Sequence, residues 1–162
     1  RAVALQLKEG TVIAADTVVA DEEGMLAKPA SAEEARQMLD RLRGKEHRVV
    51  TGVALVDAAS RQEHSGYRIS SVRMRDYTDQ EVEAYVASGS PMGKAGAYGV
   101  QDAPFRPVAQ VVGCYLNVVG LPVCTLLQTL GRLGVYPTLD PSWVPPGDCP
   151  HCHRWAREAR RE

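Results

Sequence analysis

Apolar positions recur with two different periods along this chain, and the two periods predict alternating strands and helices. Residues 11–20 are mostly apolar and β-branched, interrupted by Asp16 and Thr17, which predicts a buried strand. Residues 47–57 and 66–75 predict two further strands, joined by a polar connection as a hairpin, and residues 108–112 predict a short fourth strand.

Helices are predicted where apolar positions follow a capping sequence. Ser31 and Glu34 form a capping box, after which apolar residues continue at helical spacing to the stop at Gly44. Thr78 and Glu81 form a second capping box, whose helix ends by residues 89–91. A further apolar stripe predicts a helix over residues 123–133.

This order of elements predicts an α/β protein with a mixed sheet flanked by helices. A length of 162 residues with a 44% hydrophobic share suits one domain with its own core. Several prolines after residue 136 predict a stiff linker, and an Arg-rich helix is expected over residues 153–162.

Charge and cysteine usage narrow the possible partners. With 19 basic against 20 acidic residues, the chain is not expected to bind nucleic acid, and no apolar run approaches the length of a membrane span. The chain starts with Arg1 and not with Met, which leaves a signal peptide open. The cysteine pattern is no disulfide framework, which favours a reducing compartment, and Cys114 and Cys124 are expected as buried thiols.

The stretch around residues 93–101 is the strongest candidate for chemistry. Three glycines alternate there with Lys94 and Gln101. Glycine reaches φ > 0 without strain, so such a loop can bring backbone N–H groups close to an anion, and lysine can add a charge for a phosphate. The spacing matches neither common phosphate-loop motif, so a mobile surface turn is the competing interpretation.

A second candidate lies in the tail, where Cys149, Cys152 and His153 form a C-x-x-C-H sequence. This spacing is used for c-type haem attachment, although the chain shows no axial environment for haem. Cys149, Cys152 and His153 are also candidate zinc ligands, with His151 or a second chain completing the site. The third interpretation is a solvated thiol pair without metal.

Five blocks in a fixed order link the chain to a known family. They are Ala14-Ala15-Asp16-Thr17-Val18-Val19, Lys28-Pro29, the block 44–53, Lys94-Ala95-Gly96-Ala97-Tyr98-Gly99-Val100-Gln101 and the block 113–122. Together they resemble the Maf family of nucleoside triphosphate pyrophosphatases over about residues 11–135, and the glycine block resembles its dTTP/UTP branch.

The resemblance implies a Maf/inosine-triphosphatase-like fold, a twisted mixed sheet with flanking helices and a cleft between two lobes. It implies hydrolysis of dTTP, UTP and modified pyrimidine triphosphates to the monophosphate and pyrophosphate with Mg²⁺ or Mn²⁺, by a cytoplasmic homodimer. The expected domain covers residues 1–136, and residues 137–162 form a linker and tail outside the family pattern.

The resemblance also implies roles for individual residues. Asp16 matches the catalytic carboxylate and is expected to be general base, metal ligand or both, with Thr17 supporting it. Lys28 and Lys94 match substrate-binding positions, and Gln101 is expected to orient base or phosphate. Lys45 lies in a matched block and has two interpretations, a further phosphate clamp or a structural lysine. His47 is interpreted as structural, as are Asn117 and the turn after it.

The chain departs from the family pattern at several positions. Gly93 stands where an Asp is common, Ser90 where Glu is frequent, and Asp102 where Gly is usual. The family's Ser-x-Ser-Pro-Arg-Arg opening has no counterpart, so the chain is expected to be an N-terminally incomplete fragment and a poor enzyme on its own. These departures support a competing hypothesis of a degenerate, non-catalytic nucleotide-binding or structural module.

Overall fold

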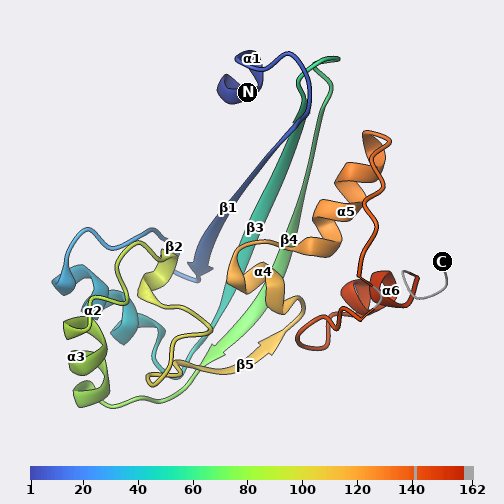
Figure 1. Cartoon of the computed structure of the whole chain (residues 1–162). Coiled ribbons are helices and arrows are strands. Elements are labelled where there is room, and N and C mark those ends of the chain that lie inside the picture. The colour runs from blue at the N-terminus through green and yellow to red at the C-terminus, as the bar shows by residue number, and fades with distance from the viewer. Residues whose placement is uncertain (141, 159–162) are drawn as a thin grey trace. The chain divides into compact units, whose positions relative to one another are not determined.

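A computed structural model describes residues 1–140 and 142–158 of the chain (Figure 1). The helices are α1 (Ala2–Leu5), α2 (Ala32–Leu42), α3 (Asp79–Ala87), the 3₁₀ turn η1 (Ala95–Ala97), α4 (Tyr115–Val119), α5 (Val123–Arg132) and α6 (Pro150–Glu158). The strands are β1 (Thr11–Asp21), β2 (Gly24–Leu26), β3 (Glu46–Asp57), β4 (Glu63–Met74) and β5 (Val108–Val112).

The five strands form one sheet in the order β2-β1-β3-β4-β5. β1 pairs antiparallel with β2, with Val19 opposite Leu26, and β4 pairs antiparallel with β5, with Ser71 opposite Val112. Helices alternate with these strands along the chain. The predicted α/β class is therefore confirmed.

Capping explains why two helices begin where the sequence predicts. The Ser31 hydroxyl accepts a hydrogen bond from the backbone N–H of Glu34 at 3.1 Å, while the Glu34 carboxylate turns to the N–H of Ala30. Thr78 and Glu81 form the complete reciprocal box at the start of α3. Each box satisfies backbone donors that the first helical turn leaves without partners.

The chain divides into two compact units that share the three long strands. Unit 1 contains Arg1–Asp16, Thr51–Arg68 and the described residues from Cys114 onward, whereas unit 2 contains Thr17–Val50 and Ile69–Gly113. β1, β3 and β4 therefore each contribute residues to both units.

In unit 1, an apolar core forms between β3 and α5. Val53, Leu55 and Leu130 are buried there, and Leu126 and Leu133 pack against them. Beside this core the side-chain oxygen of Asn117 accepts from the N–H of Thr51 at 3.0 Å, and the Thr51 hydroxyl donates to the Asn117 carbonyl at 2.8 Å. These bonds agree with the predicted structural role of Asn117.

In unit 2, aromatic rings form one part of the core. Phe105 stacks on Tyr85 with ring centroids 4.2 Å apart. The ring of Phe105 also contacts that of Tyr77, with centroids 5.0 Å apart and the two planes tilted. The Tyr77 hydroxyl donates to the carbonyl of Leu39 in α2 at 2.6 Å, which satisfies its polar end inside the core.

The structure adds elements that the hydrophobic pattern did not predict. α1, β2 and α4 each have five residues or fewer, too few for a periodic signal. β4 begins at Glu63, three residues before the predicted start, and α6 begins at Pro150 instead of residue 153. Positions 159–162 of the predicted last helix lie outside the described residues.

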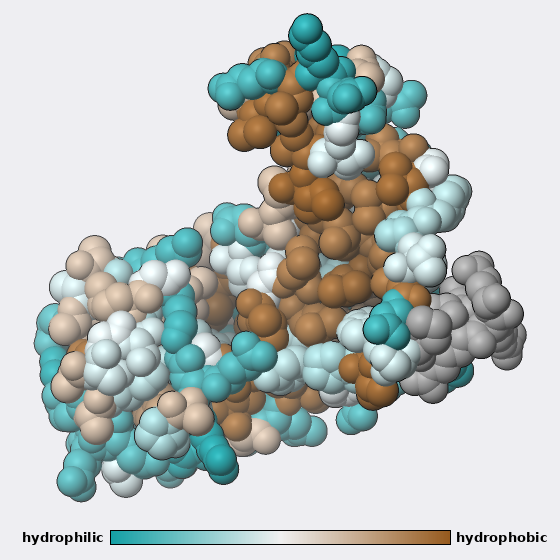
Figure 2. Space-filling model, in the orientation of Figure 1, coloured by the Kyte–Doolittle hydropathy of each residue, from teal (hydrophilic) through white to brown (hydrophobic). Residues whose placement is uncertain are grey.

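The surface of unit 1 carries exposed apolar side chains. Figure 2 shows them gathered over α1 and the strands beside it, and Val3, Leu5, Leu7 and Ile13 are exposed in this unit. None of the helices in the described part of the chain has both the length and the apolar character that crossing a membrane requires.

Candidate functional site

Asp16 and Thr17 lie in the middle of β1, where the chain passes from unit 1 to unit 2. The Asp16 side chain is exposed and that of Thr17 is half-buried. The sequence predicts a strand over residues 11–20 that Asp16 and Thr17 interrupt, but β1 runs without a break from Thr11 to Asp21, and its last three residues pair with β2. Asp16 is therefore held by regular strand backbone and not by a loop.

Within unit 2, the segment carrying Lys28 lies against the glycine loop, residues 93–102. The N–H of Gly96 donates to the carbonyl of Ala27 at 3.0 Å, directly before Lys28. Gly96 has φ 70°, and a Cβ atom there would lie 3.1 Å from the side chain of Val19. Glycine is needed at this position for both the backbone conformation and the close packing on β1.

A carboxylate organises the glycine loop from the inside. Oδ2 of Asp102 lies 2.5 Å from the ammonium nitrogen of Lys94 and accepts from the N–H of Gly99 at 3.0 Å. The Tyr85 hydroxyl donates to the same oxygen. A Cβ atom at position 99 would lie 2.7 Å from the Asp102 carboxylate, so the loop closes around this group only with glycine there.

Asp102 is the residue of this site whose role the sequence did not reveal. It stood out only as a departure from the family pattern, next to a missing acid at Gly93. In the structure Asp102 supplies the acidic partner that Lys94 lacks at position 93. The sequence did carry a signal for this role, because the chain lacks an acid at Gly93 and has one instead at Asp102, on the other side of Lys94.

The glycine loop uses several of its backbone N–H groups internally. Besides Gly96 and Gly99, the N–H groups of Lys94 and Ala97 donate to the carbonyls of Pro91 and Lys94. The sequence predicts that the loop can direct backbone N–H groups at an anion. These four N–H groups instead donate to the protein's own acceptors. Three side chains here are of types that bind phosphate: the exposed Lys28 and Gln101, and the half-buried Lys94.

His47 belongs to the packing of unit 2. It is 2% exposed, and its Nε2 atom lies 2.7 Å from the hydroxyl of Tyr98 in the glycine loop. Burial lowers the pKa of His47 to about 4, so the ring is neutral near pH 7. This agrees with the predicted structural role.

Lys45 has an exposed side chain and a structural backbone. Its N–H donates to the carbonyl of Leu42 and its carbonyl accepts from the N–H of Met74, both at 3.0 Å. The position thus links the end of α2 to β4.

The predicted zinc ligands of the tail are only partly brought together. Cys149 and Cys152 are each 1% exposed and lie with Cys114 and Cys124 in one cluster in unit 1. The interpretation as a solvated thiol pair is therefore wrong, because the tail packs these thiols against unit 1. His153 is engaged elsewhere, with Nε2 2.7 Å from the carbonyl oxygen of Gly147.

Comparisons with known proteins agree with this arrangement. The family model described as Maf-like protein matches residues 1–133. A protein of Dehalococcoides mccartyi strain 195, named dTTP/UTP pyrophosphatase, is 51% identical over 152 residues, which cover 94% of this chain and 68% of that protein. A protein of the same name from Carboxydothermus hydrogenoformans is 47% identical over 132 residues, covering 82% of this chain and 71% of the relative.

The Dehalococcoides match is longer than the 136 residues of the predicted domain, so it includes part of the predicted tail. The domain boundary at 136/137 stays a prediction. The matches extend over most of the sequence and include the blocks that carry Asp16, Lys28 and the glycine loop. On these grounds the chain belongs to the Maf family.

Proposed function

We propose that this chain is a nucleoside triphosphate pyrophosphatase acting on dTTP, UTP and modified pyrimidine triphosphates. The observation that carries the proposal is the 51% identity, over 94% of the chain, to a relative named dTTP/UTP pyrophosphatase. The exposed carboxylate of Asp16 and the lysines of unit 2 are the side-chain types that this hydrolysis needs.

In the proposed reaction a water molecule attacks the α-phosphorus, and the bond from this phosphorus to the bridging oxygen breaks. Pyrophosphate leaves with that oxygen, and the proton of the water passes to the carboxylate of Asp16. Lys28 and Lys94 bind phosphate oxygens, Gln101 orients a phosphate or the base, and Thr17 supports Asp16.

Mg²⁺ or Mn²⁺ is the proposed cofactor. Such an ion is commonly held by one or two carboxylates together with substrate phosphates, and the exposed Asp16 carboxylate fits this donor set. When bound, the ion neutralises charge that develops on the phosphates. The residues of the chain supply the proton acceptor and the remaining positive charges.

A non-catalytic nucleotide-binding or structural module is the competing proposal. It is supported by Gly93, which lacks the usual acid, and by the ion pair that neutralises Lys94 in the free protein. In that case triphosphate binds without turnover, and the carboxylate of Asp16 has no substrate to act on.

The deciding experiment incubates the chain with dTTP, UTP and GTP, each with Mg²⁺, Mn²⁺ or a chelator, and separates the products by ion-exchange chromatography. We expect slow release of monophosphate and pyrophosphate in equal amounts, with a higher kcat/KM for the pyrimidine triphosphates. Release of single orthophosphate contradicts the proposed reaction, and binding without products supports the competing module.

Asp16→Asn tests the site within that assay. Replacing a positioned base lowers kcat by about 10²–10⁴-fold while the circular dichroism spectrum stays unchanged. Glu22→Gln removes an exposed acid from the turn that follows β1 and serves as the matched control. Turnover of Asp16→Asn close to that of Glu22→Gln would remove Asp16 from the mechanism.

Further proposals concern the assembly. The exposed apolar side chains of unit 1 support a homodimer, and the four free thiols support a reducing, cytoplasmic setting. The balanced charge supports the absence of nucleic-acid partners. Light scattering after size exclusion tests the dimer, since a monomeric mass at assay concentration contradicts it.

A further inference from the structure

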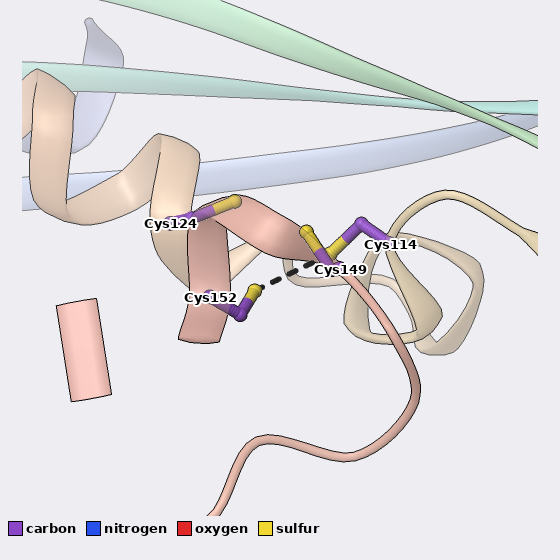
Figure 3. A group of neighbouring side chains, drawn as sticks. All are labelled: Cys114, Cys124, Cys149 and Cys152. Carbon is purple, nitrogen blue, oxygen red and sulfur yellow. Dashed lines mark hydrogen bonds between the residues drawn. The ribbon is translucent and has the colours of Figure 1, made fainter. Parts of the chain in front are cut away.

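All four cysteines of the chain meet in unit 1, although they come from separate segments. Cys114 directly precedes α4, and Cys124 lies in the first turn of α5. Cys149 directly precedes α6, and Cys152 lies in its first turn. Figure 3 shows their side chains pointing toward one another. Their sulfur atoms all lie within 4.8 Å of one another, and those of Cys114 and Cys152 are 3.7 Å apart.

These separations fit a single metal ion and not a covalent pair. The four cysteines are free thiols, so the closest sulfurs are in contact without forming a disulfide. A tetrahedral zinc ion with Zn–S bonds of about 2.3 Å requires sulfur atoms about 3.8 Å apart. The separation of Cys114 and Cys152 matches that edge, and contracting the group by an ångström or less brings in the others.

The surroundings of the four sulfurs suit a structural metal site. Each cysteine is at most 1% exposed, and Leu116, Trp143 and Trp155 pack around the group. A zinc ion with four thiolates carries a net charge of −2, and Arg68 supplies a nearby cation, with Nη2 3.6 Å from the sulfur of Cys124. Such outer contacts orient ligands and stabilise their charge.

The donor set and the spacing select the metal. Cys149 and Cys152 form the C-x-x-C pair that zinc sites commonly use, and four sulfur donors leave no open position for substrate. Soft thiolates disfavour Mg²⁺ and Mn²⁺, so this group is separate from the metal of the proposed hydrolysis.

We propose that Cys114, Cys124, Cys149 and Cys152 bind one structural Zn²⁺ ion, which ties α6 to the segments around α4 and α5. The ion replaces the four thiol protons, which are released to solvent on binding. His153 is not among the proposed ligands, because four sulfurs complete a tetrahedral site and the group of donor atoms that lie within 4.8 Å of one another contains the four cysteines but not His153. The proposal does not depend on the pyrophosphatase activity.

Elemental analysis of the full chain, purified without an affinity tag or chelator, tests the proposal. We expect about one zinc per chain, and replacing zinc with Co²⁺ should give the intense sulfur-to-cobalt absorption of a tetrathiolate site. Iron in place of zinc, or a chain that stays metal-free after incubation with excess Zn²⁺, overturns it.

Variants separate the four-cysteine site from a C-x-x-C-H site. Cys124→Ser should lower the zinc content to a small fraction of one, although position 124 lies outside the tail motif. His153→Gln is the matched control and should retain full zinc and the tetrathiolate cobalt spectrum. Full zinc in Cys124→Ser, or its loss in His153→Gln, contradicts the assignment.

A measurement on the unaltered chain covers the case in which a cysteine variant fails to fold. Stripping zinc with a strong chelator should lower Tm, and adding back Zn²⁺ but not Mg²⁺ should restore it. An unchanged Tm together with full removal of the metal would show that zinc does not hold this structure together.

Discussion

Lys94 is paired with Asp102 before any substrate arrives, so its charge must be shared or transferred when a phosphate binds. A hydrogen bond to a charged group contributes about 1.5–3 kcal/mol. Losing the hydrogen bond between Lys94 and the triphosphate is therefore expected to raise KM about 10–100-fold. The same carboxylate keeps two other donors, Tyr85 and Gly99, which hold the loop without the lysine.

Lys94→Ala is therefore expected to raise KM for dTTP by about one to two orders of magnitude and to leave the urea unfolding midpoint nearly unchanged. Asp102→Asn tests whether the carboxylate acts through the lysine. If it does, the double variant has the KM of Lys94→Ala alone. Independent, additive effects of the two substitutions would contradict that coupling.

His47 predicts a pH dependence of stability. The folded chain holds it neutral with a pKa of about 4, whereas the unfolded chain protonates it near 6.5. Between these values the unfolded state binds the extra proton, so the free energy of unfolding falls as the pH decreases. We expect a loss of about 2 kcal/mol between pH 7.5 and about pH 5, measured by urea unfolding.

His47→Phe should reduce this dependence, and Tyr98→Phe, which keeps the imidazole, should retain it. Asp21 and Glu81 have their pKa lowered to about 2, by hydrogen bonds to Arg41 and to the Thr78 backbone respectively. Their contributions are lost mainly as the pH falls below about 4.5, outside this window. Equal slopes in wild type and His47→Phe would contradict the assignment.

At the scale of elements, the glycine loop depends on close approach at one position. Gly99→Ala places a Cβ atom against the Asp102 carboxylate, so the loop must open and Lys94 loses its partner. We expect a loss of stability of about 1–3 kcal/mol and a raised KM for dTTP.

Gly52→Ala provides the comparison, because a Cβ atom there meets nothing within 4 Å and its backbone is ordinary strand. Urea unfolding and steady-state kinetics of both variants check the prediction. Equal behaviour of the two alanines would show that the loop tolerates displacement of Asp102.

At the scale of the whole molecule, the tail contributes packing to unit 1. A chain ending after Tyr136 loses Cys149 and Cys152, as well as Trp143 and Trp155, from the cluster around Cys114. Burying one large apolar side chain stabilises by about 1.5–3 kcal/mol, so the shortened chain should unfold at a clearly lower temperature.

The shortened chain keeps Asp16, Lys28, Lys94 and Gln101, and we expect its kcat to be close to that of the full chain well below Tm. Calorimetry and the product assay measure the two quantities separately. An unchanged Tm would contradict the packing role of the tail, and a folded but inactive chain would contradict its dispensability for hydrolysis.

Much of the secondary structure was predictable because it depends on residues a few positions apart. The caps at Ser31 and Thr78 set the starts of α2 and α3, and β5 has the bounds that its apolar run predicts. Short elements such as β2 form through pairing with a neighbour and have no periodic signal of their own. The roles of Asp16, Lys28, Lys94 and Gln101 stay predictions that rest on the family's motifs.

The sequence by itself determined the α/β class, the starts of the two capped helices, the bounds of β5 and the family, because periodicity, caps and motifs are local in the chain. Only the tertiary structure decided that Asp102 partners Lys94 and that Cys114 meets Cys152, which lies 38 positions away. Such pairings depend on the path of the chain between the residues. The local spacing of the C-x-x-C-H motif therefore indicated a metal site but pointed to His153 as a ligand. In the fold, Cys149 and Cys152 lie beside Cys114 and Cys124 instead.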